Sequence, residues 1–172
     1  MLFWFMLAVG YVAGQDRVCS GQPELGNTTN GVKPEIRYWF DSERMECFPF
    51  LYKGSCGNGN RYTTSGDCYS ACMPLDYSSC GFGIENVGLC ATFEQRECAS
   101  KDAVCHMGAF FGFCCPKAAM DRANNPKCPN AKTVVKQADS TTWTLMGRKC
   151  SHQFCPSGST CVDGEFYAYC CK

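Results

Sequence analysis

The sequence predicts a small, disulfide-rich α+β fold, and three observations support this fold class. Cysteine makes up 17 of the 172 residues, a density typical of secreted disulfide scaffolds because cytosolic thiols are kept reduced. The cysteines fall into three groups that short connectors separate. The first group combines a β-hairpin pattern with a short helix pattern, whereas the other two contain hairpin patterns alone.

The N-terminal segment, residues 1–14 (MLFWFMLAVGYVAG), is apolar, has no charged side chain and ends in small residues. This pattern is typical of a signal peptide that is cleaved near Gly14. A membrane span needs roughly 20 apolar residues, so the segment is too short for a comfortable anchor. We therefore expect a secreted, extracellular protein without membrane association.

Acidic and basic residues balance at 16 each. A neutral chain without a basic run argues against binding to nucleic acid, heparin or a membrane surface as the main task. We expect no nucleic-acid partner.

The first cysteine group contains the pattern of two strands and one helix. Residues 37–52 (RYWFDSERMECFPFLY) read as strand, polar turn and returning strand. Further on, Thr and Ser in residues 63–72 (TTSGDCYSAC) are positioned to cap a short helix. Cys68 and Cys72 are four residues apart and lie on one face of that helix. The group therefore predicts a hairpin with a helix fastened against it.

The second and third groups, residues 80–115 and 128–171, repeat one another. Each has a cysteine, eight residues rich in aromatics and Gly, and a closing CC pair, which predicts a small hairpin stapled at its end. Adjacent cysteines very rarely bond each other, so each CC pair should reach two different partners. Six cysteines allow 15 connectivities, which stay open at this point. The connectors, residues 73–79 and 116–127, are expected to be exposed chain.

The first group resembles the Kunitz (pancreatic trypsin inhibitor) domain over residues 19–72. The resemblance implies a twisted β-hairpin with a C-terminal helix, bridges Cys19 with Cys72 and Cys47 with Cys68, and inhibition of a serine protease through an exposed loop. The third group is similar to the lustrin-type cysteine-rich repeat of nematode secreted proteins, and the second is a looser match. The Kunitz resemblance rests on Cys19, Gly26, the RYWFD strand, Cys47, Phe50, Tyr52, Gly54, the GNGN run with Asn60, Tyr62, Cys68 and Cys72.

One bridge of the Kunitz pattern is missing, namely the bridge that ties the protease-contact loop to the neighbouring turn. The loop cysteine's place holds Thr28 when counted forward from Cys19 and Gly31 when counted back from the RYWF strand. The partner's place holds Ser55, with Cys56 one step later. Because 17 is odd, Cys56 is the candidate for an unpaired cysteine. It is either part of an intermolecular disulfide that gives a dimer or matrix attachment, or a capped, buried or otherwise bridged thiol.

By the same resemblance, the contact loop comprises six residues, and the residue after the loop cysteine's place fills the protease's specificity pocket. That residue is Thr29 by the first count, Val32 by the second, and Lys33 after one further step. Thr or Val suits an elastase- or chymotrypsin-like enzyme better than a trypsin-like one. Asn27 begins an Asn-Thr-Thr glycosylation sequon beside the loop. The expected loop residues are Thr28, Thr29, Asn30, Gly31, Val32 and Lys33.

No motif for catalysis, a cofactor or a metal stands out. His152 lies between cysteines, a pattern that also occurs in zinc sites, but in an oxidising compartment disulfides are favoured there, so we expect no metal. The paired aromatics are expected to form the cores of the modules rather than a binding face. The sequence thus predicts a non-enzymatic, secreted Kunitz-type serine protease inhibitor, weakened by its missing bridge. The alternative is a non-inhibitory extracellular matrix or interaction module. Channel blocking, known for toxin relatives of the fold, is disfavoured by the neutral charge.

Overall fold

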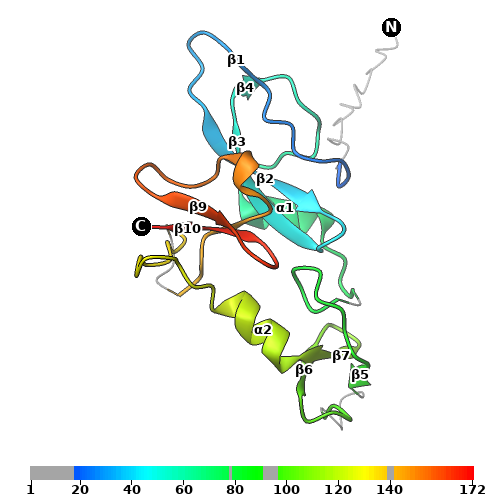
Figure 1. The fold of residues 1–172 in the computed structure, drawn as a ribbon. Helices are drawn as coiled ribbons and strands as arrows, with labels where there is room; N and C mark the ends of the chain where they lie inside the picture. The colour runs from blue at the N-terminus through cyan, green and yellow to red at the C-terminus, as the bar shows by residue number, and fades with distance from the viewer. Residues whose placement is uncertain (1–17, 78, 91–96, 139–141) are drawn as a thin grey trace, which may run out of the picture.

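The structure, a computed structural model, describes residues 18–77, 79–90, 97–138 and 142–172. The expected signal peptide lies outside these residues. Figure 1 shows three parts in contact: an N-terminal module with β1–β4 and α1, a first repeat with β5–β7, and a second repeat with β8–β10. Helix α2 joins the two repeats.

The N-terminal module is built on the expected hairpin and helix. Strands β2 (Glu35–Asp41) and β3 (Glu46–Tyr52) pair antiparallel from Glu35 opposite Tyr52 to Asp41 opposite Glu46. Helix α1 (Ser65–Cys72) begins after Thr64, whose hydroxyl accepts a hydrogen bond from the backbone N–H of Asp67 at 3.0 Å. Both sequence predictions are confirmed. Two short strands, β1 (Asn27–Thr28) and β4 (Gly54–Ser55), complete the module.

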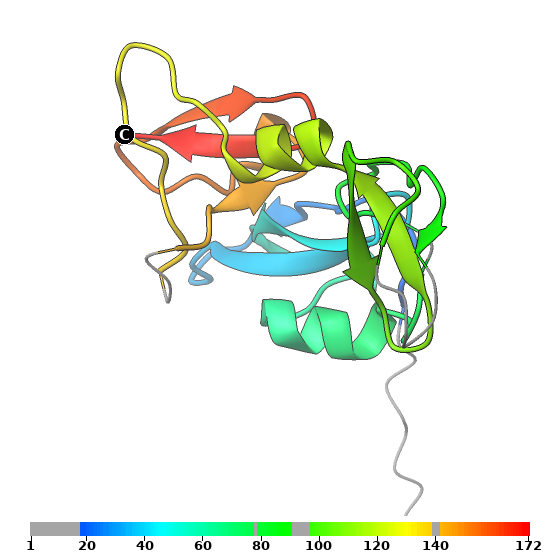
Figure 2. The same ribbon diagram turned by 90° about the horizontal axis from the view of Figure 1, so that it is seen from below.

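Alternation along β2 and β3 gives the hairpin two buried faces. Phe40 and Cys47 lie under α1, where Cys47 is bonded to Cys68. Trp39 and Phe50 point to the opposite face. Figure 2 shows the hairpin as a middle layer between α1 and the second repeat. The hairpin therefore has no solvent-facing side over this stretch, in contrast to a free-standing two-stranded unit.

The two repeats share strand order and disulfide connectivity. The first has β5 (Leu89–Cys90), β6 (Ala103–Met107) and β7 (Gly112–Pro116) in the order β5-β7-β6. The second has β8 (Met146–Gly147), β9 (Thr160–Asp163) and β10 (Ala168–Cys171) in the order β8-β10-β9, with a 3-10 turn at Cys150–His152. In each repeat the first cysteine bonds the sixth, the second the fourth and the third the fifth: Cys80–Cys115, Cys90–Cys105 and Cys98–Cys114, then Cys128–Cys171, Cys150–Cys161 and Cys155–Cys170. Each CC pair reaches two different partners, as the sequence predicts.

The expectation that residues 116–127 form an exposed connector is wrong in part. Residues Lys117–Asn124 form helix α2, whose Ala123 is buried and accepts a hydrogen bond at its carbonyl oxygen from the Tyr167 hydroxyl. Alanine and methionine favour helix, and Ala119, Met120 and Ala123 face one cluster at helical spacing. The connector is therefore a structural element that fixes the second repeat against the first.

A single apolar cluster runs through all three parts of the molecule. Residues from the outer face of the hairpin, both repeats and α2 contribute to it, so the repeats do not depend on their disulfides alone. Small modules bury too little surface to fold independently, and sharing a core is a second solution to that problem. The buried members are Trp39, Phe48, Phe50, Tyr52, Cys80, Ile84, Cys115, Ala123, Tyr167, Tyr169 and Cys171.

The turn between β2 and β3 holds the polar contacts of this interface. Asp41 is only 2% exposed, and its Oδ2 lies 2.7 Å from Nε of Arg148 in the second repeat. Arg44 donates hydrogen bonds to the carbonyl oxygens of Phe82 and Phe166, one in each of the other two parts. Glu46 accepts a hydrogen bond from the Tyr69 hydroxyl, and burial raises the pKa of the Glu46 carboxyl. One turn thereby contacts every part of the molecule.

Candidate protease-contact loop

The expected contact loop follows β1 and leads into β2. Its residues Thr28, Thr29, Asn30, Gly31, Val32 and Lys33 are all exposed. Figure 1 shows this loop at the end of the molecule opposite the first repeat. The structure therefore brings all six predicted loop residues together on a free surface.

Strand pairing takes the place of the missing bridge. Asn27 lies opposite Ser55 and Thr28 opposite Gly54 in the β1–β4 ladder. The Ser55 hydroxyl also donates a hydrogen bond to the carbonyl oxygen of Asn27 at 3.1 Å. Next to this ladder, the backbone N–H of Lys53, the residue before β4, donates to the carbonyl oxygen of Leu25 at 2.8 Å. The loop is thus fastened to the neighbouring segment by hydrogen bonds alone.

Gly26 permits this close approach. Its φ is +68°, and a Cβ there would lie 2.2 Å from the carbonyl oxygen of Ser55 and 2.9 Å from the Tyr52 ring. Any side chain would push the two strands apart. The glycine of the Kunitz pattern therefore serves the pairing directly.

The extra residues of the loop fold into a tight turn. The N–H of Val32 donates to the carbonyl oxygen of Thr29 at 3.0 Å, and Gly31 has φ +83°. A left-handed residue at the third position, occupied by glycine, is typical of a type II turn. The Val32 side chain then lies over Gly54, where an added Cβ would be 2.5 Å from its Cγ1. The Asn-Gly pair in the sequence is a turn signal that could have identified this feature.

Cys56 forms no disulfide. All 17 cysteines lie in the described part of the chain, and Cys56 is the free, exposed one among them. Its backbone is fixed in the left-handed region at φ +62°. The carbonyl oxygen accepts hydrogen bonds from the Tyr52 hydroxyl and from Nη1 of Arg61, both at 2.9 Å. The thiol is therefore presented from an ordered turn, directly after the Ser55 that pairs with the loop.

A buried amide ties the chain before the loop to the hairpin. Asn60 is fully buried; its Oδ1 accepts from the N–H of Phe40 at 2.9 Å, and its Nδ2 donates to the carbonyl oxygens of Phe40 and Gly21 at 2.9 and 3.0 Å. A Cys19–Cys72 bridge anchors the same segment to α1. Both entry and exit of the loop are thus held by buried contacts.

His152, the histidine that lies between cysteines in the sequence, packs in the core, and its flanking cysteines are in disulfides. His152 is buried edge-on against Trp39, with ring centroids 5.8 Å apart, and burial lowers the pKa of its imidazole. The flanking Cys150 and Cys155 are bonded to Cys161 and Cys170. Sulfurs in disulfides cannot act as thiolate ligands.

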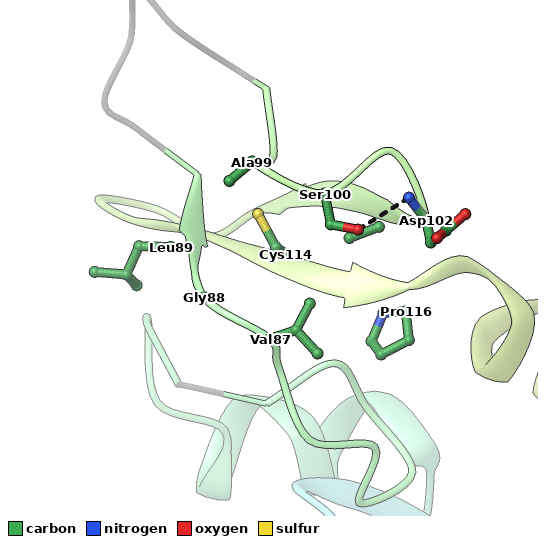
Figure 3. A pocket seen from close by; sticks show the side chains of 9 residues that line it. Val87, Gly88, Leu89, Ala99, Ser100, Asp102, Cys114 and Pro116 are labelled. Carbon is green, nitrogen blue, oxygen red and sulfur yellow. Dashed lines mark hydrogen bonds between the residues drawn. The ribbon is translucent and has the colours of Figure 1, made fainter.

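A shallow cavity of about 260 Å³ lies in the first repeat rather than at the loop. Figure 3 shows Val87 and Leu89 on one side of it and Ser100 and Asp102 on the other. The Ser100 hydroxyl already accepts a hydrogen bond from the N–H of Asp102 at 3.2 Å. The cavity lining is mainly apolar, which does not indicate a catalytic site.

The described residues contain no helix that is long and apolar enough to span a membrane.

Comparison with known proteins agrees with the fold. The Kunitz/Bovine pancreatic trypsin inhibitor domain model matches residues 18–73. The BPTI/Kunitz inhibitor domain-containing protein C02F12.5 of Caenorhabditis elegans is 37% identical over 158 residues, which cover 90% of this chain and 89% of that protein. The chain belongs to the Kunitz family.

Two further Kunitz relatives differ in how much of the chain they share. Major allergen Ani s 1 of Anisakis simplex is 33% identical over 154 residues, covering 83% of this chain and 78% of that protein. A proteinase inhibitor of Tachypleus tridentatus is 41% identical over 54 residues, covering 31% of this chain and 84% of that protein. The similarity to the Caenorhabditis elegans and Anisakis simplex proteins thus extends well beyond the matched Kunitz domain, into the part of the chain that contains the repeats. The lustrin-type assignment of these repeats stays a prediction. The disulfides and the Kunitz relatives together indicate an extracellular protein.

Proposed function

We propose that the chain is a secreted Kunitz-type serine protease inhibitor whose contact loop is held by β1–β4 pairing instead of the missing disulfide. The observation that carries this proposal is the exposed loop of residues 28–33, fastened at both ends. A pre-ordered loop loses little entropy when it binds, which is the basis of inhibition by loop insertion. The Kunitz match and a relative named proteinase inhibitor support the same function.

Inhibition is expected to be weaker than with a covalent pin. Hydrogen bonds can open where a disulfide cannot, and each side chain that must be ordered again costs about 0.5–1.5 kcal/mol. Two or three such residues weaken binding about a hundredfold, at about 1.4 kcal/mol per factor of ten. A glycan on the exposed Asn27 side chain would stand beside the loop and hinder a protease further.

The strand pairing favours Thr29 as the specificity residue. The segment opposite Gly54 and Ser55 is Asn27–Thr28, not Gly31, which supports the forward count within one residue. Val32 is engaged in the turn and against Gly54, so it is less free to enter a pocket. A small β-branched side chain at this position favours an elastase- or chymotrypsin-like enzyme over a trypsin-like one.

The test is an inhibition titration of the oxidised chain, as wild type and as the glycan-free Asn27→Gln variant, against elastase, chymotrypsin and trypsin. We expect inhibition of elastase or chymotrypsin, and a gain of trypsin inhibition in Thr29→Arg. The matched control is Val32→Arg, which puts the same charge on the other side of the turn. Trypsin inhibition by Val32→Arg but not by Thr29→Arg would reassign the specificity residue. No inhibition of any enzyme at micromolar protein would reject the proposal.

A second candidate function is a non-inhibitory extracellular matrix or interaction module, which the free, exposed Cys56 favours. An unpaired thiol in an oxidising compartment can bond a second chain and give a covalent dimer. Gels run with and without reductant separate the two states. A dimer band that reductant or Cys56→Ser removes would support this candidate, and a monomer in both gels would reject the dimer.

A further inference from the structure

Exposed apolar side chains concentrate in and just before the first repeat. Nine large hydrophobic residues of the described chain are exposed, and six of them lie between Leu75 and Phe111. Three of these, Leu75, Phe110 and Phe111, are 82%, 61% and 56% exposed. Phe110 and Phe111 lie in the turn of the β6–β7 hairpin, and Leu75 directly precedes Asp76, which is hydrogen-bonded to that turn. We call these three residues the tip surface. Phe110 and Phe111 depart from the expectation that the paired aromatics form cores. The expectation holds for the other pairs, whose buried members are Trp39, Phe40, Phe48, Phe50, Tyr167 and Tyr169.

The second repeat has the same hairpin turn, but with one aromatic, Tyr167, buried and the other, Phe166, partly buried. The N–H of Gly108 donates to the carbonyl oxygen of Phe111 at 2.7 Å, and the N–H of Gly164 donates to that of Tyr167 at 3.0 Å. Counting from the facing cysteines of each hairpin, Cys105 with Cys114 and Cys161 with Cys170, Phe110 corresponds to Phe166 and Phe111 to Tyr167. The molecule therefore contains two copies of one aromatic hairpin turn.

The contacts of the second turn reveal what such a turn binds. Tyr167 is 4% exposed, and its ring centroid lies 5.0 Å from that of Phe82. Arg44 donates to the carbonyl oxygen of Phe166 at 3.4 Å, and the Arg122 guanidinium lies 5.8 Å from the centroid of the Phe166 ring. The turn thus packs against an apolar surface, and two arginines lie at the edge of that contact.

The first turn is equally ordered but has no such cover in the described chain. Both carboxylate oxygens of Asp76 accept hydrogen bonds from the turn, from the N–H of Ala109 at 2.7 Å and from that of Phe110 at 2.9 Å. A Cβ on Gly108 would lie 2.1 Å from Asp76 Oδ1, so glycine permits the contact. The aromatic side chains are therefore presented by a turn that is already fixed, which reduces the entropy lost on binding.

We propose that the tip surface is a docking site for a second protein, whose groove has an apolar floor and Arg or Lys at its rim. Charge supports this partner: residues 73–90 and 103–116 contain Asp76 and Glu85 but no Lys or Arg. The same charge disfavours an anionic membrane and a symmetric pairing of two tip surfaces.

Area also argues against a dimer of this chain. With roughly 200 Å² for each whole side chain and exposed fractions of 82%, 61% and 56%, the tip surface exposes about 400 Å². This is half of the about 800 Å² per partner in a standard stable interface. Two exposed phenylalanines on an ordered turn do suit the centre of a smaller interface, where a few aromatic anchors carry most of the affinity.

The first repeat, which carries Phe110 and Phe111, and the contact loop after β1 lie toward opposite ends of the molecule (Figure 1). A protease on the loop therefore leaves the tip surface free. The docking site would let the chain bind a second protein while it holds the first.

The test selects a displayed library of random linear peptides on the immobilised full chain, and then titrates the enriched synthetic peptide by calorimetry. We expect enriched peptides to combine apolar residues with Arg or Lys. Their affinity for the double variant Phe110→Ser/Phe111→Ser should be lower by a factor of about thirty or more. Asp76→Ala should weaken binding by an intermediate factor because the turn loosens. Val104→Ser, an exposed apolar residue of β6 away from the turn, is the matched control and should bind as the wild type does.

Four outcomes would overturn the proposal: no enrichment, enriched peptides without Arg or Lys, equal binding by the double variant, or equal loss in Val104→Ser. Cosedimentation with phosphatidylcholine and phosphatidylserine vesicles, and sedimentation velocity of the chain alone, test the other occupants. Vesicle binding or self-association that the double variant loses would replace the proposed protein partner. Protease inhibition should be the same in the double variant, so a failure here is separable from a failure of the inhibitor function.

Discussion

The two ends of the β2–β3 hairpin are stabilised in opposite ways. At the open end, the contact loop is exposed and held by the β1–β4 ladder and the Ser55 hydroxyl. At the turn end, Asp41 is buried against Arg148, and Arg44 donates to both other parts of the molecule. The chain lacks a covalent pin at the end that carries the proposed protease-contact loop, and makes extensive contacts at the other end.

This difference indicates where stability and function can be separated. Loop order at the open end depends on a few hydrogen bonds worth about 0.5–1.5 kcal/mol each. Global stability depends on the shared core and the buried ion pair, far from the loop. A substitution at one end should therefore leave the property of the other end almost unchanged, and variants at each end test this.

The largest expected effect is from Arg148→Ala. It leaves Asp41 charged and 2% exposed without its partner, and breaking a buried pair in this way costs about 3 kcal/mol. Urea unfolding followed by tryptophan fluorescence measures the loss, because Trp39 lies in the shared core. Lys149→Ala, the exposed neighbouring cation, is the control and should change stability little. A loss below about 1 kcal/mol in Arg148→Ala would mean that the turn end is not the stronger one.

The next effect is a loss of stability in mild acid that originates at His152. Burial, with Lys149 and Arg148 nearby, lowers the pKa of His152 below the ordinary histidine value of 6.5, although Asp41 and Asp163 act in the opposite direction. The unfolded chain then takes up the proton first, so stability is lost as pH falls from 6.5 towards the folded-state pKa. His152→Gln should remove this loss, measured as urea midpoints at about pH 7.5 and about pH 5.5.

Glu46 opposes His152 and provides the control. Burial raises the pKa of its carboxyl above 4.5, so the folded chain takes up this proton first and gains stability as pH falls through that range. Glu46→Gln should therefore remove this gain, so that its urea midpoint falls further than that of the wild type as the pH approaches 4.5. Equal acid profiles for wild type and His152→Gln would assign the loss to other groups.

Substitutions at the open end are expected to have the smallest effect on stability, but they should change protease inhibition. Ser55→Ala removes the hydrogen bond to Asn27 and should weaken protease inhibition about fivefold, with unfolding changed by no more than about 1 kcal/mol. The converse variant combines Asn27→Cys and Ser55→Cys in a chain that also carries Cys56→Ser. It would place a disulfide between residues that face each other in the β1–β4 ladder, and it should strengthen inhibition. Its comparator is Asn27→Gln in Cys56→Ser, which also lacks the glycan. If the bridged variant inhibits no better than this comparator, hydrogen bonds already hold the loop as firmly as a disulfide would.

The hairpin and helix could be predicted because local patterns specify them. Alternating aromatics around Trp39, a polar turn at Asp41–Glu46, and Thr64 before α1 each act within a few residues. The exposed contact loop followed from the position of Cys19 and the RYWF strand. The turn at Asn30–Gly31 was within reach of the same reasoning, since Asn-Gly is a strong turn signal.

The remainder depends on contacts between distant segments. Nothing near Arg148 in the sequence points to Asp41, which is 107 residues away. Helix α2 was hidden by Pro and Asn residues around a short Ala-rich stretch, and its burial depends on Tyr167. Phe110 and Phe166 occupy equivalent turns, yet only packing by other modules decides which pair is exposed. Local pattern cannot distinguish them.

The CC pairs divide four of the repeats' bridges into two classes by the core that each bridge faces. Cys114 and Cys170 face the small core of their own repeat, and their bridges close sequence separations of 16 and 15 residues. Cys115 and Cys171 face the core that all modules share, and their bridges close separations of 35 and 43 residues. The short bridges are shielded by residues of their own repeat, whereas the long ones are shielded only after the modules dock. During maturation, the long bridges would therefore remain open to thiol exchange until assembly is complete, and a wrongly docked chain could still be corrected.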